Sequence, residues 1–169
     1  RYRKNGVLRR LRATPLRAGE FLVAQIISRL LVVTGVTVLV FAGTNALLDF
    51  PMRGSYLALG LVFLSGAIAL ISLGLAVSAR VRSEELADGL LNLMSWPMMI
   101  LSGVWFSLEG TNVWAQRIAE LLPLTHMVEA ARRIMLDGAG LTDVTFEIGI
   151  LLGIGLVLLT LSSRAFRWQ

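Results

Sequence analysis

The residues best suited to chemistry are His126 and Glu129, which stand three positions apart and share one face of an expected helix. An imidazole and a carboxylate at this spacing could ligate a metal ion or form an acid–base couple. The chain has no other histidine and no cysteine, so a tetrahedral metal site would need carboxylates recruited from elsewhere. We therefore expect His126 to be a hydrogen-bonded histidine, and no catalytic, cofactor-binding or metal-binding residue in this chain.

Phosphate-binding and hydrolase motifs are also missing from the sequence. It contains no G-x-x-x-x-G-K-[ST] run, no G-x-S-x-G elbow and no H-E-x-x-H pair. A process driven by ATP would therefore need the ATP and magnesium of another chain. We expect no cofactor in this one.

The composition indicates a membrane protein. Of the 169 residues, 56% are hydrophobic and 16% are charged, whereas soluble domains carry about 25% charged residues. The net charge of +5 does not indicate a nucleic-acid partner, because the cations stand at the ends of apolar runs rather than on a polar face with aromatic residues. The expected surroundings are a lipid bilayer.

Long uncharged runs predict an all-α membrane protein, a polytopic bundle with four spanning helices and short re-entrant or interfacial helices on the outer side. About 20 apolar residues are needed to cross the bilayer core. A bend is expected at Pro97, because proline removes a backbone donor. The predicted spans are about 22–48, 56–79, 88–106 and 144–163 within one transmembrane domain, residues 1–169.

Basic residues orient these spans. Eleven lysines and arginines border one side and four border the other. The positive-inside rule then predicts that both ends of the chain and the 80–88 loop lie in the cytoplasm. The expected location is the cell (inner or plasma) membrane.

The basic segment 1–20 has two interpretations. Val7, Leu8 and Leu11 recur at helical spacing, and Thr14-Pro15 suits the start of a new helix. The segment could be a tail resting on anionic lipid, or a short cytoplasmic helix that docks on a soluble partner. Charge density does not separate the two.

Gln25 and Arg29 lie on the first span, just inside its cytoplasmic end. Snorkelling of these side chains to the interface explains both positions. The alternative is an inward-facing polar patch, which makes Gln25 and Arg29 candidate pathway residues.

The segment 107–143 is too long for a turn and too apolar for a solvated loop. We predict an outer helical pair, 112–122 ended by Pro123 and about 126–137 capped by Thr125 and ended by Gly138. Glu129 can pair with Arg132 or Arg133, three and four residues further along its own helix. Such short amphipathic helices would lie in the outer interface or re-enter it.

Small residues indicate close helix packing at two places. These are a stripe in the second span and a G-x-x-x-G pattern in the last one. Whether they pack within one chain or between chains stays open. The residues are Ser65, Ala69, Ser72, Ala76, Gly149, Gly153 and Gly155.

A sequence pattern before the last span resembles a known family. Pro123-Leu124-Thr125-His126, five residues and then Arg132 are similar to the signature P-L-x-H-x5-R of the ABC transporter permease family, type-2 exporter class. LRATPL at 11–16 and SGVWFSLE at 102–109 support the resemblance. The family includes exporters of drugs, lipids and polysaccharides.

The resemblance implies more than the spacing does. Family members have six spans per subunit, so this chain resembles the last four. Two permeases, as a homodimer or as related subunits, pair with cytoplasmic ABC ATPases that bind the ATP and magnesium. The segment 1–20 would be the ATPase-coupling segment, and the outer pair would be the family's re-entrant helices. The implied residues are Gly6, Leu8, Arg10, Leu11, Thr14 and Pro15 for coupling, and Pro123, Leu124, His126 and Arg132 for the signature.

The function expected from this resemblance is ATP-driven export of a hydrophobic or amphipathic, drug-like or lipid-like substrate. A secondary transporter should carry ionisable residues near mid-membrane, and the predicted spans have none there. A membrane enzyme would rest on His126 and Glu129 alone. A purely structural subunit remains a third alternative.

Overall fold

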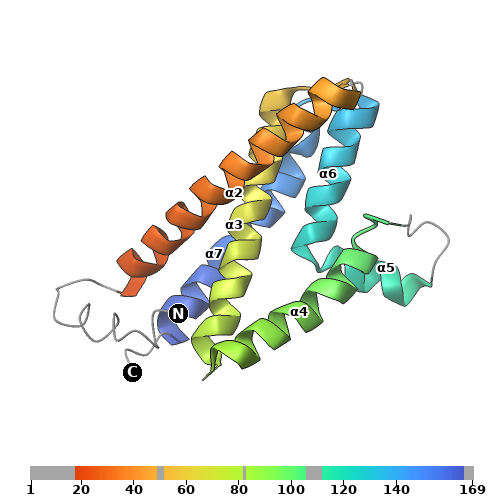
Figure 1. The fold of residues 1–169 in the computed structure, drawn as a ribbon. Helices are drawn as coiled ribbons and strands as arrows, with labels where there is room; N and C mark the ends of the chain where they lie inside the picture. Colours follow the sequence, from red (N-terminus) through yellow and green to blue (C-terminus); the bar gives the residue numbers. More distant parts are fainter. Residues whose placement is uncertain (1–17, 49–51, 82, 106–111, 166–169) are drawn as a thin grey trace.

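In the part of the chain that the computed structural model describes, residues 18–48, 52–81, 83–105 and 112–165, the regular elements are all helices. Figure 1 shows the long helices side by side, with shorter helices against one flank. The all-α prediction is confirmed. In chain order the elements are α2 (Ala18–Leu48), α3 (Tyr56–Arg80), α4 (Glu84–Leu101), α5 (Val113–Glu120), α6 (Pro123–Asp137), the 3-10 turn η1 (Thr142–Val144) and α7 (Thr145–Ala165).

Three of the described helices are long and apolar enough to cross a membrane. The apolar segments are Val23–Leu48, Tyr56–Arg80 and Thr142–Ser163. They agree closely with three of the four predicted spans. The first residue of each segment lies within two positions of the predicted one. The agreement is close because charged or turn-forming residues border each apolar run.

The fourth predicted span, 88–106, is not confirmed. It overlaps α4, which is 18 residues long and begins with two glutamates and Asp88 in its first five residues. These carboxylates lower the mean hydropathy of a helix that has no length to spare. Pro97 lies inside α4, and the helix continues to Leu101. The four-span count and the bend at Pro97 therefore stay predictions.

The helix α3 is the centre of the fold, since it packs against α7 along its length and also contacts α6 and α2. Ser65, Ala69 and Ser72 are buried in α3. A Cβ on Gly155 of α7 would lie 3.2 Å from Ile68 Cγ2 and 3.5 Å from the Ala69 backbone. The small-residue stripe is therefore a contact within this chain. It brings two backbones close, which is how helices associate where lipid is as apolar as the side chains.

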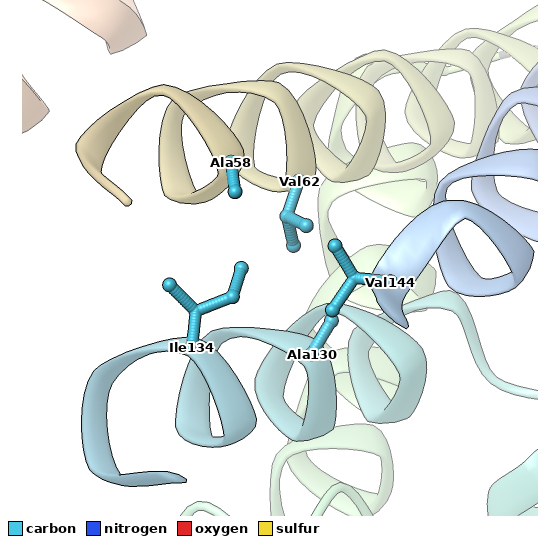
Figure 2. Close-up of a cluster of buried hydrophobic side chains, with 5 residues drawn as sticks. All are labelled: Ala58, Val62, Ala130, Ile134 and Val144. Atoms are coloured by element: carbon cyan, nitrogen blue, oxygen red, sulfur yellow. The ribbon is translucent and has the colours of Figure 1, made fainter. Parts of the chain in front are cut away.

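A cluster of buried side chains packs α6 against the N-terminal half of α3. Figure 2 shows Ala58 and Val62 of α3 pointing toward Ala130 and Ile134 of α6, with Val144 of η1 closing the group. The smaller residues let Ile134 and Val144 fill the space between the elements, so each gains many short dispersion contacts. The cluster joins α6 to both α3 and the start of α7.

The segment before α3 holds the end of α6 through its backbone. Arg53 N donates to the carbonyl of Met135 at 3.2 Å, and Arg53 Nη1 donates to the carbonyl of Leu136 at 3.1 Å. Gly138 terminates α6 with a left-handed φ of 75°. The prediction that Gly138 ends this helix is confirmed. Carbonyls that the helix end leaves unpaired thus receive donors.

The segment before α3 and the end of α6 form a contact that we call the clamp, and Gly54 is its point of closest approach. A Cβ there would clash with the backbone oxygen of Ile134 and lie 2.9 Å from its Cγ2, whereas a Cβ on Gly60 would meet nothing within 4 Å. Gly54→Ala is expected to lower the free energy of unfolding by about 1–3 kcal/mol through overpacking. Gly60→Ala should be neutral or stabilising by up to about 1 kcal/mol. Thermal unfolding of both variants in detergent checks this; equal melting temperatures would contradict the clamp.

The predicted helical pair is present with different boundaries. The first helix, predicted over 112–122, is α5 at Val113–Glu120. The second begins at Pro123 rather than near residue 126, because proline has the φ of a first helical residue and needs no hydrogen-bond acceptor there. The capping role predicted for Thr125 is wrong, since Thr125 lies within α6 and its buried Oγ1 has no hydrogen-bond partner.

The second helix of the pair, α6, starts beside the middle of α3 and ends beside its N-terminus. Met127 of α6 lies against Gly66, in the middle of α3, and Ile134 lies against Gly54, just before that helix. In Figure 1, α6 runs along the upper half of α3. This arrangement suits a pair that dips into a membrane, and the re-entrant assignment stays a prediction.

Candidate functional site

An open cleft of about 520 Å³ lies between α2 and α3. Most of its lining is apolar, and the polar side chains in it are Ser28 and Arg29 of α2. Its volume falls within the range of small-molecule sites, about 300–1,000 Å³. The apolar lining comes from Val32 and Val33 of α2, from Phe63, Ala67, Leu70, Ile71 and Gly74 of α3, and from Met127 of α6.

The structure separates the two candidate pathway residues. Arg29 lines the cleft, and it makes no hydrogen bond or ion pair with the described part of the chain. Gln25 is half-buried one turn earlier on α2 and does not line the cleft. Arg29 is therefore the charged group available to a molecule in the cleft.

His126 connects the two short helices. Its Nε2 lies 2.7 Å from the carbonyl oxygen of Glu120, the last residue of α5. Because a carbonyl only accepts, Nε2 must carry the proton. The contact supplies a donor to a carbonyl that the end of α5 leaves unpaired. His126 thus has a structural partner, and in the described ranges no three His, Cys, Asp or Glu side chains group as metal ligands would.

The other signature residues also lie where α4, α5 and α6 meet. Pro123 begins α6 and is buried, and Leu124 beside it is half-buried. Arg132 Nη2 donates to the carbonyl of Gly103 at 2.8 Å. Gly103 follows α4 in a left-handed conformation, with φ at 76°. The signature thus connects the end of α4 to both helices of the outer pair.

Loss of the Arg132 contact should weaken this connection. A hydrogen bond from a charged group contributes about 1.5–3 kcal/mol when buried, and Arg132 is exposed. Arg132→Gln is therefore expected to lower the free energy of unfolding by about 1 kcal/mol. Glu129→Gln is the matched control, because Glu129 is an exposed residue of the same helix. Chemical denaturation in detergent checks both, and equal stability of the two variants would contradict a role for Arg132.

An ion pair between α6 and α7 was missed by sequence reasoning. Arg133 Nη1 lies 2.5 Å from Glu147 Oε1, and Arg133 Nη2 donates to the carbonyl of Asp143 at 3.0 Å. Glu147 is 7% exposed, and its Oε2 is buried without a partner. The available signal was a lone carboxylate between Phe146 and Ile148 at the edge of an apolar run, a position that usually requires a partner.

The predicted pairing of Glu129 with Arg132 or Arg133 is wrong. Both arginines reach other elements, namely Gly103 after α4 and Glu147 of α7. Glu129 is an exposed residue of α6. A local pair on a helix surface contributes only about 0.2–0.5 kcal/mol, so contacts in less solvated places prevail.

The coupling residues Gly6, Leu8, Arg10, Leu11, Thr14 and Pro15 lie outside the described residues. What the structure does show is which helix ends share a side. The start of α2, the end of α3 and the end of α7 lie at the same end of the bundle (Figure 1). This agrees with the predicted grouping of both chain ends with the 80–88 loop. Which side of a membrane they face stays a prediction.

Comparison with known proteins identifies similar sequences over most of the chain. A family model described as ABC-2 type transporter matches residues 1–136. "ABC transporter G family member 20" of Dictyostelium discoideum is 32% identical over 138 residues, which is 81% of this chain and 19% of that protein. "Probable multidrug ABC transporter permease YbhR" of Escherichia coli (strain K12) is 24% identical over 144 residues, 85% of this chain and 39% of that protein.

The alignment with a third relative covers a larger share of that relative's length. "Daunorubicin resistance ABC transporter permease protein DrrB1" of Streptomyces coeruleorubidus is 27% identical over 170 aligned positions, 96% of this chain and 58% of that protein. This chain therefore spans between about a fifth and three-fifths of the length of these three relatives. No solved structure gives a significant match.

Proposed function

The chain belongs to the ABC-2 type transporter family, and from that premise we propose that it forms part of the permease subunit of an ABC exporter. In this proposal the subunit moves a hydrophobic or amphipathic substrate out of the cell. The observation that carries the proposal is the family match over 1–136, which covers two of the three helices long enough to cross a membrane. The chain is a multi-pass membrane protein of that family.

ATP hydrolysis is assigned to a separate subunit. The family implies a partner ATPase, and the curated relatives named as permeases are the membrane components of ABC transporters. This sequence has no phosphate-binding loop of its own. The cytoplasmic ATPase would hold ATP and magnesium, and its closure would drive alternating access of a pathway between two permeases.

The ATPase would be contacted by the coupling segment, residues 1–20. This proposal places both ends of the chain in the cytoplasm, in agreement with the excess of basic residues on that side. It also places the outer pair, α5 and α6, on the far side of the membrane as the part that closes the pathway. The second permease would be another copy or a related subunit.

The substrate class follows from chemistry and from two relatives. The spans are predominantly apolar, which suits a substrate that partitions into the bilayer. Two relatives are named for multidrug transport and daunorubicin resistance. We propose a drug-like or lipid-like substrate on these grounds.

Efflux from cells tests this function. The intact protein is expressed with its ATPase, and loss of a fluorescent hydrophobic dye is followed in the presence of glucose. Efflux should stop when the ATPase carries a substitution that blocks hydrolysis and should continue when an ionophore collapses ion gradients. The reverse pattern would indicate a secondary transporter and would contradict the proposal.

A further inference from the structure

We propose that the cleft between α2 and α3 binds a membrane phospholipid with an anionic headgroup. The phosphate contacts Arg29, and an acyl chain lies along the apolar walls. This site is independent of the export function, because it requires only that the protein lie in a bilayer.

The charge of Arg29 is the first support. Arg29 lies six residues, or about 9 Å along the helix, inside the apolar segment Val23–Leu48, whose mean hydropathy is 2.1. No acidic side chain of the described chain lines the cleft. A cation at such a depth is costly unless it reaches an anion or water. The planar guanidinium matches a phosphate with two parallel hydrogen bonds.

The shape of the cleft is the second support. Ile26 packs with Leu75 in one buried cluster, so Arg29, one turn further along α2, lies near the Gly74 end of the antiparallel α3. From Gly74 to Phe63 the apolar wall extends about 16 Å along α3. Met127 contributes to the lining from α6, and its flexible thioether adapts to chains of different shape. A cation at one end of an apolar trough is complementary to an amphipathic anion.

The bilayer is the source that fits this trough. Within the described part of the chain, only 6% of the most apolar stretch of α2 is buried, and Val32 is 65% exposed. The described residues therefore leave this side of the cleft open to acyl chains of the surrounding membrane. Free phosphate would occupy the Arg29 end alone and leave the apolar wall uncovered. Burial of that wall against an acyl chain is the larger contribution.

Native mass spectrometry of the intact protein in a neutral detergent tests the site. The probes are phosphatidylglycerol and phosphatidylcholine with identical acyl chains. We expect phosphatidylglycerol to bind about 10- to 100-fold more tightly. Both lipids carry a phosphate, but the choline cation of phosphatidylcholine offsets the attraction of its phosphate to Arg29. Arg29→Gln should reduce this preference to about twofold or less, and Arg29→Lys should keep part of it.

A pair of glycine variants tests the apolar wall. Gly74 lines the cleft, and a Cβ on it would meet nothing within 4 Å, so Gly74→Leu should fold and fill the cleft. It is expected to weaken binding of both lipids about tenfold. Gly60→Leu is the matched control, since Gly60 is equally open and lies on α3 outside the cleft. Unchanged melting temperatures would show that each variant is folded.

Three results would overturn the proposal. The first is equal binding of the two lipids to the unaltered protein. The second is a preference for phosphatidylglycerol that survives Arg29→Gln. The third is displacement of phosphatidylglycerol by inorganic phosphate at equal concentration, which would identify an anion site without a lipid chain. Loss of ATP-dependent export would affect none of these measurements, so the two proposals fail separately.

Discussion

Scrambling residues 6–15 in the intact transporter is expected to reduce ATP-dependent efflux to the level of a transporter whose ATPase is inactive. The segment stands directly before α2, which begins at Ala18, and it contains the residues predicted to contact the ATPase. Movement of a separate ATPase reaches the spans only through a contact whose strength differs between two states. Without the ordered sequence, ATP hydrolysis should continue uncoupled or cease, and the substrate should stay in the cell.

The scrambled variant distinguishes the two interpretations of this segment. Scrambling keeps every arginine and therefore keeps the attraction to anionic lipid. A tail that only rests on the membrane would work equally well after scrambling. Co-purification of the ATPase should fall together with efflux, while membrane insertion should be unchanged. Normal efflux after scrambling would remove the docking role and favour the lipid-bound tail.

Arg133→Met is expected to lower the free energy of unfolding by about 2–3 kcal/mol. Removing one partner of a buried ion pair costs about 3–5 kcal/mol. We expect a smaller loss here because the Arg133 side chain is 38% exposed and its charge is partly screened by solvent. Glu147 would remain buried with neither carboxylate oxygen paired, since Oε2 already has no partner. Denaturant titration of the purified protein in detergent measures the loss.

Two further variants make this result interpretable. Arg133→Met combined with Glu147→Leu should recover most of the stability, because an apolar pair of similar size replaces the ion pair. Arg117→Met is the control, since Arg117 lies on exposed α5 and contacts the Trp114 ring at 5.9 Å; it should change stability by less than about 1 kcal/mol. A double variant as unstable as Arg133→Met would show that the pair itself, and not the orphaned carboxylate, matters.

The long helices could be predicted from sequence because their signal is local. In α2, α3 and α7 an apolar run of sufficient length is bounded by charges or turns, and the free energy of transfer into lipid depends mainly on such a run. For α4 the signal is mixed. The carboxylates of Glu84, Glu85 and Asp88 and the proline at 97 offset the apolar residues, so the predicted span 88–106 stays unconfirmed.

The details of the outer pair depended on tertiary contacts. Pro123 is compatible with both the end of one helix and the start of the next, and only the packed structure shows that it begins α6. The partners of Arg132 and Arg133 lie 29 and 14 residues away along the chain. A rule based on neighbours three or four residues apart does not reach them.

The direction in which each glycine faces explains why the glycines of α7 differ in their contacts. Gly155 meets α3, whereas a Cβ on Gly149 or Gly153 would meet nothing within 4 Å. Two residues along a helix correspond to a rotation of about 200°, so Gly153 and Gly155 face opposite sides. The cleft beside Arg29 likewise depends on how far α2 stands from α3, which no sequence pattern specifies.

Transport by purified components tests the central claim most directly. The intact protein and its partner ATPase are reconstituted in liposomes with the ATPase outward, and accumulation of a hydrophobic fluorescent drug is followed after ATP is added. We predict accumulation that requires hydrolysable ATP and the ATPase, and none with a non-hydrolysable analogue. Accumulation driven by an ion gradient without ATP, or unchanged when the ATPase is omitted, would contradict the assignment as an ABC export permease.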